Sequence, residues 1–196
     1  MPPIVIKLGG SLYNTPELTL WLKALVAYSS QQPIVIVPGG GPFADLVRDA
    51  QKLYRFDDKV AHHMAIVAMK QFGVLLMSLE AHCNTFSIDN NHSSGLSVWL
   101  PEDSLLDETD IKQCWSISSD SLALWLANRI SAQQLLLIKR INPSSRSIKE
   151  LSEACIVDAG FSHLFSQQPI IAKIIHDQHH HLLAEKISDA ALKLST

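Results

Sequence analysis

The chain has 196 residues, of which 47% are hydrophobic and 18% are charged, and its formal net charge is −3. This composition is that of a folded globular chain, and the length fits one domain with a sizeable core. The mildly acidic balance, without a basic stripe, argues against a nucleic-acid partner. No apolar run approaches the roughly 18 residues of a membrane helix, so no membrane partner is expected. Three scattered cysteines without metal or redox spacing favour a cytoplasmic location.

Two short apolar runs near the N-terminus each end in a glycine-rich turn. The run at 4–8 predicts a strand and leads into Gly9, Gly10 and Ser11, and the run at 34–37 predicts a second strand and leads into Gly39, Gly40 and Gly41. Apolar positions from Leu18 to Val26 repeat every 3.6 residues and predict a helix between the strands. Bare backbone at a helix start offers N–H groups and the helix dipole to an anion. The two turns therefore predict a site that holds phosphate from two sides.

The remaining sequence alternates between helical and strand patterns. We predict helices over 43–53, 60–81, 119–130 and 179–194, strands over 85–88, 96–100, 134–138 and 169–175, a polar turn between the strands at 85–88 and 96–100, and an irregular loop over 142–147. This order predicts an α/β fold, a three-layer αβα sandwich with a mainly parallel central sheet, in one domain over 1–196. Ligands of such sheets bind at the carboxyl ends of the strands, where both glycine turns lie.

The first turn places a lysine before its glycines. Neither turn has the lysine of a P-loop or the G-x-G-x-x-G of a dinucleotide site. Lys7 instead emerges at the strand end, where its ammonium can lie over phosphate oxygens while Gly9 and Gly10 admit the backbone and Ser11 adds a hydroxyl. The alternative is a strand-end lysine without a ligand. Three successive glycines at 39–41 cost chain entropy, so a close backbone approach is favoured there over a plain turn.

Two further charged residues are suited to the same chemistry. Asp120 sits where a loop enters a predicted helix, so it either complements the helix dipole or orients Lys7 and a second lysine. Lys139 follows the strand at 134–138 and is either solvated or part of the site. Phosphoryl transfer asks a protein mainly for positioning and for charge from lysines, backbone amides and magnesium. These residues therefore favour a phosphotransferase.

Three motifs resemble the amino acid kinase superfamily in order and spacing: K-L-G-G-S-L at 7–12, P-G-G-G-P-F-A-D at 38–45 and S-S-D-S-L-A at 118–123. The likeness covers the first 140 residues well and the last 55 poorly. It implies an ATP- and Mg²⁺-dependent kinase with a small-molecule substrate, in a homo-oligomer. The roles that it implies are catalytic for Lys7, Asp120 and Lys139, nucleotide-phosphate binding for Gly9, Gly10 and Ser11, and acceptor binding for Gly39, Gly40, Gly41 and Asp45. His62 and His63 either line the acceptor pocket or pack at a helix start.

The nucleotide side departs from the superfamily pattern. Superfamily members follow the strand equivalent to 134–138 with Thr-Asp-x-Asp-Gly, whereas positions 139–143 here read Lys-Arg-Ile-Asn-Pro. The later nucleotide-side lysine has no secure match, and Lys139 and Lys173 are its candidates. The resemblance thus implies an acceptor-binding part over 1–132 and a reduced nucleotide-binding part over 133–196.

Within the superfamily, the compact chain looks most like one branch. The triple glycine before Phe-Ala-Asp, the pair His62-His63, and Val157-Asp158 before an aromatic are similar to the kinases of aminomethylfuran phosphate in methanofuran biosynthesis and one-carbon metabolism. That acceptor is a phosphate monoester, which is converted to a diphosphate. Three alternatives stay open: an amino-acid carboxylate kinase, a non-catalytic ligand-binding relative that has lost the nucleotide side, and a subunit whose helix at 60–81 mainly serves assembly.

Other conspicuous side chains have simpler interpretations. The histidines at 176 and 179–181 lack a supporting set of cysteines or carboxylates, which favours a solvated helix start, and we expect no metal ligands in the chain. Trp21, Trp115 and Trp125 are expected in the core or an interface rather than against a ligand. Arg48 is expected in a surface salt bridge rather than at the acceptor.

Overall fold

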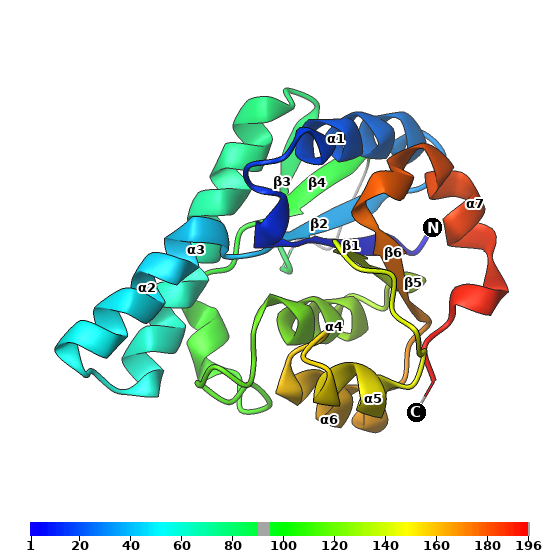
Figure 1. Cartoon of the computed structure of the whole chain (residues 1–196). Helices are drawn as coiled ribbons and strands as arrows, with labels where there is room; N and C mark the ends of the chain where they lie inside the picture. Colours follow the sequence, from blue (N-terminus) through cyan, green and yellow to red (C-terminus); the bar gives the residue numbers. More distant parts are fainter. Residues whose placement is uncertain (90–94, 196) are drawn as a thin grey trace.

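The computed structural model describes residues 1–89 and 95–195. Six strands form one sheet in the order β3-β4-β2-β1-β5-β6 (Figure 1), and all five strand pairings are parallel. At its centre, β1 (Ile4–Leu8) lies between β2 (Ile34–Pro38) and β5 (Gln134–Lys139), and the outer strands are β3 (Cys83–Phe86), β4 (Leu96–Trp99) and β6 (Ala172–His176). The chain turns from one half of the sheet to the other at β1, and such a reversal is where α/β sheets bind ligands.

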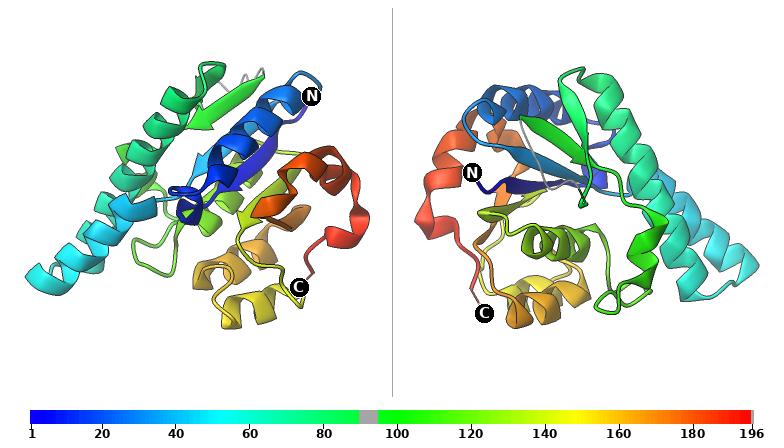
Figure 2. Two further views of the ribbon diagram at one scale, coloured as in Figure 1. Left: turned by 45° about the horizontal axis from the view of Figure 1, so that its top comes forward. Right: turned by 180° about the vertical axis from the view of Figure 1, so that it is seen from behind.

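Helices cover both faces of the sheet. One face carries α1 (Pro16–Ser29) and α7 (Leu183–Ser188), and the opposite face carries α4 (Ser119–Arg129), α5 (Ile148–Glu153) and α6 (Ala159–Gln167) (Figure 1). Figure 2 shows that α2 (Gly41–Tyr54) and the adjoining part of α3 (Asp58–Leu79) pack together and project beyond the sheet. The predicted three-layer αβα sandwich is confirmed, and the central sheet is parallel throughout its paired strands.

The alternation of side chains along β1 determines which face each residue serves. Ile4, Ile6 and Leu8 are buried in the core under α1 and α7. Val5 belongs to the core under α4 to α6. Because successive strand residues point to opposite faces, Lys7 shares the face of Val5. The continuous apolar pattern of β1 thus reflects a strand covered on both sides, with one lysine directed toward α4.

The long helix α3 joins the two cores. Phe72 and Leu76 pack in one core, and Ile66 and Met69 pack in the other. By length and composition alone, α3 is apolar enough to cross a membrane, with a window of mean hydropathy 1.4. The sequence-based expectation that no segment is long and apolar enough for a membrane helix is therefore wrong for α3. However, 44% of this window is buried within the protein, and a core helix passes the same test.

The C-terminal region differs most from the predicted elements. The single helix predicted over 179–194 is wrong: a 3₁₀ helix over Asp177–Leu182 is followed by α7 and a short 3₁₀ helix over Ala190–Leu192. His179, with φ −94° and ψ 22°, interrupts the first segment. Asp189 is extended and its side chain accepts a hydrogen bond from the Ala191 N–H, which separates α7 from the last turn. The short helices α5 and α6 are additional to the predicted elements.

Several boundaries move by a few residues. Strand β3 lies at Cys83–Phe86 rather than 85–88, and β6 begins at Ala172 rather than 169. Ser119 is the first residue of α4, and Ser118 precedes it without a side-chain capping bond. The polar turn predicted between β3 and β4 falls partly on 90–94, outside the described residues. These shifts leave the carboxyl ends of β1, β2 and β5, where the candidate residues lie, as predicted.

Candidate active site

The two glycine turns are in direct contact with each other. The Gly39 N–H donates a hydrogen bond to the Leu8 carbonyl at 2.8 Å. A Cβ atom on Gly10 would lie 2.2 Å from the Gly41 nitrogen, and one on Gly39 would lie 2.4 Å from the Gly10 nitrogen. Glycine at these two positions is therefore already required by the packing of one turn on the other. The close approach of one turn's backbone to the other explains why both positions are glycine, without any contact to a ligand.

The other glycines have different neighbours. A Cβ on Gly9 would lie 3.2 Å from the Lys7 Nζ and 3.4 Å from the Ser11 hydroxyl, so Gly9 keeps space open beside the ammonium. A Cβ on Gly40 would overlap the Ala44 side chain at 2.3 Å. Gly41 has a φ of +54°, in the left-handed region that favours glycine, and it begins α2. Of these, Gly9 is the glycine whose missing side chain opens directly onto a charged group.

Lys7, Asp120 and Lys139 form a buried charge cluster. Lys139, like Lys7, shares its strand face with residues of the α4-side core, because β5 alternates in the same way as β1. Asp120, in the first turn of α4, reaches both lysines. Its Oδ1 lies 2.9 Å from the Lys7 Nζ, an ionic contact outside hydrogen-bond geometry. Its Oδ2 accepts a hydrogen bond from the Lys139 Nζ at 2.5 Å.

This cluster is deeply buried and carries a net positive charge. Lys7 is 6% exposed and Asp120 is 4% exposed. Burial alone would raise the pKa of Asp120, but the charges of Lys7 and Lys139 outweigh it and hold that pKa at about 2. Burial, together with the charge of Lys7, lowers the pKa of Lys139, and Asp120 partly opposes this shift. Within the cluster, two lysines face one carboxylate beside the space at Gly9, which suits a phosphate; Asp158 is a further carboxylate near enough to raise the pKa of Lys139.

Asp158 fixes the segment that carries Asp120, and the sequence prediction gave it no such role. Its carboxylate accepts hydrogen bonds from the Ser118 N–H at 2.9 Å, the Ser118 hydroxyl at 2.7 Å, and both the N–H and hydroxyl of Ser121. It also caps α6 by accepting from the Phe161 N–H. Asp before a short helix is an N-cap signal, so the cap of α6 could be predicted from the sequence. The bonds of Asp158 to Ser118 and Ser121, which lie some 40 residues earlier, could not be predicted.

A cavity of about 430 Å³ opens next to the glycine turns, between α2, α3 and the segment before α4. It is lined by Gly10, Ser11, Tyr13, Asn14, Gly40, Gly41, Pro42, Ala44, Asp45, Arg48, His62, Ala65, Ile66, Met69, Trp115, Ile117, Ser118, Ser119 and Leu122. Residues predicted for the acceptor on two different helices thus meet in one cavity. Its volume is that of a small-molecule site.

The two adjacent histidines of α3 lie in different surroundings. His62 lines the cavity and is 4% exposed, and its Nε2 has no hydrogen-bond partner among the described residues. Burial lowers the pKa of His62, with a smaller opposing effect from the Cys114 backbone. His63 points away from the cavity and lies 3.2 Å from Asp103, on an exposed face. The structure therefore brings His62, but not His63, to the predicted acceptor side.

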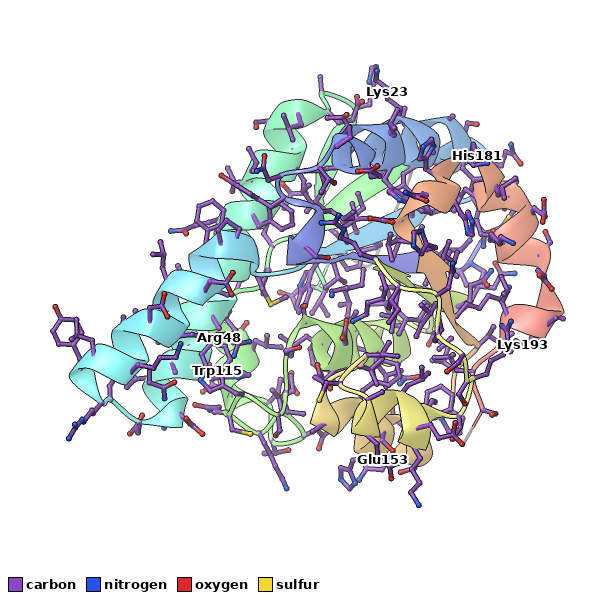
Figure 3. All side chains as sticks on the ribbon, viewed as in Figure 1. Lys23, Arg48, Trp115, Glu153, His181 and Lys193 are labelled. Atoms are coloured by element: carbon purple, nitrogen blue, oxygen red, sulfur yellow. The ribbon has the colours of Figure 1, made fainter. Side chains whose placement is uncertain are left out.

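Arg48 and Trp115 both line the cavity, and their side chains lie next to each other (Figure 3). The guanidinium carbon of Arg48 lies 3.8 Å from the centroid of the Trp115 ring. The Trp115 Nε1–H donates to the Gln51 Oε1 at 2.6 Å. The salt bridge expected for Arg48 is absent among the described residues, because its charge lies on the indole instead. Trp21 and Trp125 are buried core residues, whereas Trp115 lines the cavity.

On the other side of β1, only one of the two candidate lysines reaches the charge cluster. Lys173 lies in the first half of β6 and is buried away from it, and its Nζ donates to the carbonyls of Lys186 and Ile187 at the end of α7. At the carboxyl ends of β5 and β6, Asp177 instead contacts Arg140 at 3.4 Å and His176 at 3.0 Å. Lys173 is therefore a structural residue, and Lys139 is the second lysine of the site.

A parallel αβα sandwich with buried lysines beside glycine turns defines the architecture of a phosphotransferase. Residues 2–143 match the model of the amino acid kinase family, and the chain belongs to this family. Over 193 residues it is 26% identical to the [5-(aminomethyl)furan-3-yl]methyl phosphate kinase of Methanocaldococcus jannaschii, covering 89% of this chain and 88% of that protein.

Solved structures of the same fold include two uridylate kinases. The uridylate kinase from Archaeoglobus fulgidus superposes with a TM-score of 0.70 at 14% identity, over 97% of both chains. The UMP kinase from Ureaplasma parvum gives a TM-score of 0.69 at 16% identity, over 94% of this chain and 95% of the other. These likenesses show that the fold is shared over nearly the full length, including the C-terminal part beyond the family match.

Proposed function

We propose that this protein is an ATP- and Mg²⁺-dependent kinase that transfers the γ-phosphoryl group to a phosphate monoester such as aminomethylfuran phosphate and forms a diphosphate. Two findings support the acceptor class: the M. jannaschii relative is named for that substrate, and it aligns over most of both chains. The corresponding role is in methanofuran biosynthesis, within one-carbon metabolism in the cytoplasm. Family membership supports the reaction type.

The observation that carries the proposal is the cluster of Lys7, Asp120 and Lys139 beside the open space at Gly9. The ammonium of Lys7 would stabilise the charge on the transferring phosphoryl group, and Asp120 would hold both lysines in position. Because both Asp120 oxygens already face lysines, this carboxylate does not fit a metal ligand. Mg²⁺ would enter with the ATP phosphates and neutralise part of their charge.

The two halves of the chain would divide the substrates between them. Residues 1–132 would hold the acceptor in the cavity lined by Gly40, Gly41, Asp45 and His62, with Gly39 as the preceding residue of the same turn, and residues 133–196 would form a reduced nucleotide side. Gly9, Gly10 and Ser11 would contact the nucleotide phosphates at the boundary. His63 is left out of this assignment because it faces Asp103 on the outer surface.

An ATP-consumption screen across phosphate monoesters and amino-acid carboxylates tests this proposal. The phosphate monoester should be turned over, and Lys7→Ala should lower kcat by about a thousandfold or more, the usual scale for a group that stabilises transition-state charge. Lys23→Ala, at an exposed lysine of α1, is the matched control and should retain full activity. Wild-type activity in Lys7→Ala would sink the assignment, and turnover of carboxylates alone would assign the acceptor to the other class.

Calorimetry separates the kinase from a non-catalytic relative that has lost the nucleotide side. The kinase should bind Mg·ATP without the acceptor, and Lys139→Met should weaken that binding. A protein that binds only the small ligand, with no heat from Mg·ATP, would belong to the binding class instead.

The outer surface of α2 and α3 supports a homo-oligomer. Several large apolar side chains of these two helices are exposed: Leu46, Leu53, Tyr54, Val60, Met64, Val67, Val74 and Leu79. Exposed apolar side chains that form one patch commonly mark a protein interface, and the proposed assembly would bury them. Sedimentation velocity should show an oligomer that Val67→Lys dissociates, whereas Leu20→Lys, at an exposed leucine of α1, should not. A monomeric wild-type protein at micromolar concentration would refute this assembly.

A further inference from the structure

Asp45, a solvent-exposed residue, contributes a carboxylate to the lining of the acceptor cavity. It lies one turn after the start of α2. Arg48, three residues later on the same helix, is the residue that would ordinarily pair with it. Among the described residues, however, neither side chain takes part in an ion pair. A lone carboxylate at a cavity wall is available to a cation from outside the protein.

The reason is that Arg48 is held elsewhere. Its guanidinium stacks over the Trp115 ring at 3.8 Å, and the indole N–H of Trp115 is fixed by Gln51 (Figure 3). Cation–π stacking and the hydrogen bond reinforce each other, because both keep the indole in one orientation. Arg48 and Trp115 therefore line the cavity as a stacked pair, and within the described part of the chain no ion pair compensates the charge of Asp45.

The part of the cavity at the glycine turns attracts negative charge. There it is lined by Gly10, Ser11 and Gly41, next to Gly9 and the buried ammonium of Lys7. Asp45 lies four residues further along α2, which corresponds to about 6 Å at the helical rise of about 1.5 Å per residue. The positive region at the glycine turns and the negative charge of Asp45 are thus separated by about the width of a small aromatic ring. This arrangement matches a ligand that carries both charges.

His62 provides an independent sign that a polar ligand enters this cavity. Its Nε2 is buried without a partner, and an unsatisfied buried polar atom is costly unless something binds it. Because burial favours the neutral imidazole, His62 does not repel a cation at Asp45. It is suited to a hydrogen bond with an uncharged polar atom of the ligand.

We propose that Asp45 binds an ammonium group of the acceptor, so that the acceptor is a small zwitterion with its phosphate at the glycine turns and its amine about one helical turn away. This inference rests on the proposed kinase function and names the chemical class of its acceptor. Recognition of the amine by Asp45 favours aminated acceptors over those that carry a phosphate alone, since the latter bring no counter-charge to this carboxylate.

Steady-state kinetics with two acceptors tests the role of Asp45. The probes are aminomethylfuran phosphate and the same phosphate ester without its amino group, each with Mg·ATP. Asp45→Asn should raise KM for the aminated acceptor by about 10- to 100-fold, the usual worth of a charge-assisted hydrogen bond, and change KM for the amine-free ester less than about twofold. Asp49→Asn is the matched control, because Asp49 lies on the same helix and pairs with Lys52 outside the cavity.

The outcomes distinguish this inference from the proposed function. Turnover by the wild type together with equal effects of Asp45→Asn on both acceptors would overturn the role of Asp45 and leave the kinase intact. Failure of the wild type to turn over either acceptor would count against the proposed function. In that case calorimetry with the aminated acceptor decides the inference: tighter binding to the wild type than to Asp45→Asn supports it, and equal or no binding overturns it.

Discussion

The proposed acceptor side and the proposed nucleotide side differ in how many of their predicted residues the structure brings to the site. On the acceptor side, the turns at 9–11 and 39–41 pack on each other and open into a cavity bounded by α2 and α3. On the nucleotide side, β5 ends at Lys139 and is followed by Arg140, in place of an acidic pair. Only Lys139 joins the charge cluster there, whereas Lys173 supports α7.

The comparison shows that two buried lysines of neighbouring strands can have different roles. Lys139 ends its strand on the face of α4, where Asp120 accepts from its ammonium. Lys173 lies earlier in its strand, and its ammonium donates to carbonyls at the end of a helix. The position of a lysine along its parallel strand therefore determines whether it can serve the site or only support the fold, because ligands bind at the carboxyl ends of the strands.

The largest effect on kcat is expected from Asp120, whose carboxylate contacts a lysine from each side of the site. Asp120→Asn removes the charge that orients both lysines and should lower kcat by about a thousandfold, with a smaller change in KM. Asp103→Asn, at an exposed aspartate, is the control and should behave as the wild type. If Asp120→Asn changed KM alone, the cluster would serve binding rather than transfer.

Glycine substitutions separate folding from chemistry on the acceptor side. Gly39→Ala forces a methyl group to within 2.4 Å of the Gly10 nitrogen and should lower the free energy of unfolding by about 3 kcal/mol or more. Gly9→Ala meets the ends of two flexible side chains, so it should cost about 1 kcal/mol or less while lowering kcat about tenfold. Urea unfolding and kinetics measure both. Equal losses of stability in the two variants would contradict the packing described for the turns.

The pH dependence of stability tests the charge cluster itself. The pKa of Asp120 is about 2 in the folded protein and 3.8 ordinarily, so its ionised form stabilises the fold above that ordinary value. This contribution, about 2 kcal/mol, is lost as the pH falls from about 4 to about 2. The difference in unfolding free energy between the wild type and Asp120→Asn should shrink over this window. A difference that stays constant with pH would show that the lysines do not depress the pKa.

The smallest functional effect is expected from the structural lysine. Lys173→Met leaves carbonyls at the end of α7 without their donor and should lower stability by about 1–3 kcal/mol. Its affinity for Mg·ATP, measured by calorimetry, should stay within about twofold of the wild type. A large loss of nucleotide affinity in this variant, matching that of Lys139→Met, would remove the contrast between the two lysines.

Much of the fold could be predicted because, in the N-terminal two thirds, the hydrophobic periodicity agrees with the glycines and prolines that mark the ends of helices and strands. The strand at 4–8, the helix with Pro42 near its start, and the buried strand at 134–138 each have a pattern that fits one type of element much better than the other. The C-terminal third could not be read so well, since α5 spans only 6 residues and α6 only 9, too short for a clear helical period. The run at 176–181 is helical in composition, but the backbone at His179 interrupts it.

The site was predictable to a similar degree. The face shared by Lys7 and Lys139 follows from strand alternation, and Asp120 follows from its place at a helix start. The stacked pair of Arg48 and Trp115 could not be predicted, because the two residues are 67 positions apart and no local pattern joins them. The same holds for Asp158, whose bonds to Ser118 and Ser121 depend on how α6 packs beside α4.

The most direct test of the central claim is phosphorus NMR of the full chain with Mg·ATP and aminomethylfuran phosphate. The proposed function predicts that ADP appears together with the paired resonances of a new diphosphate ester, and that Lys7→Ala forms neither. Conversion of ATP to ADP and free phosphate with the acceptor unchanged, or no consumption of ATP, would contradict it.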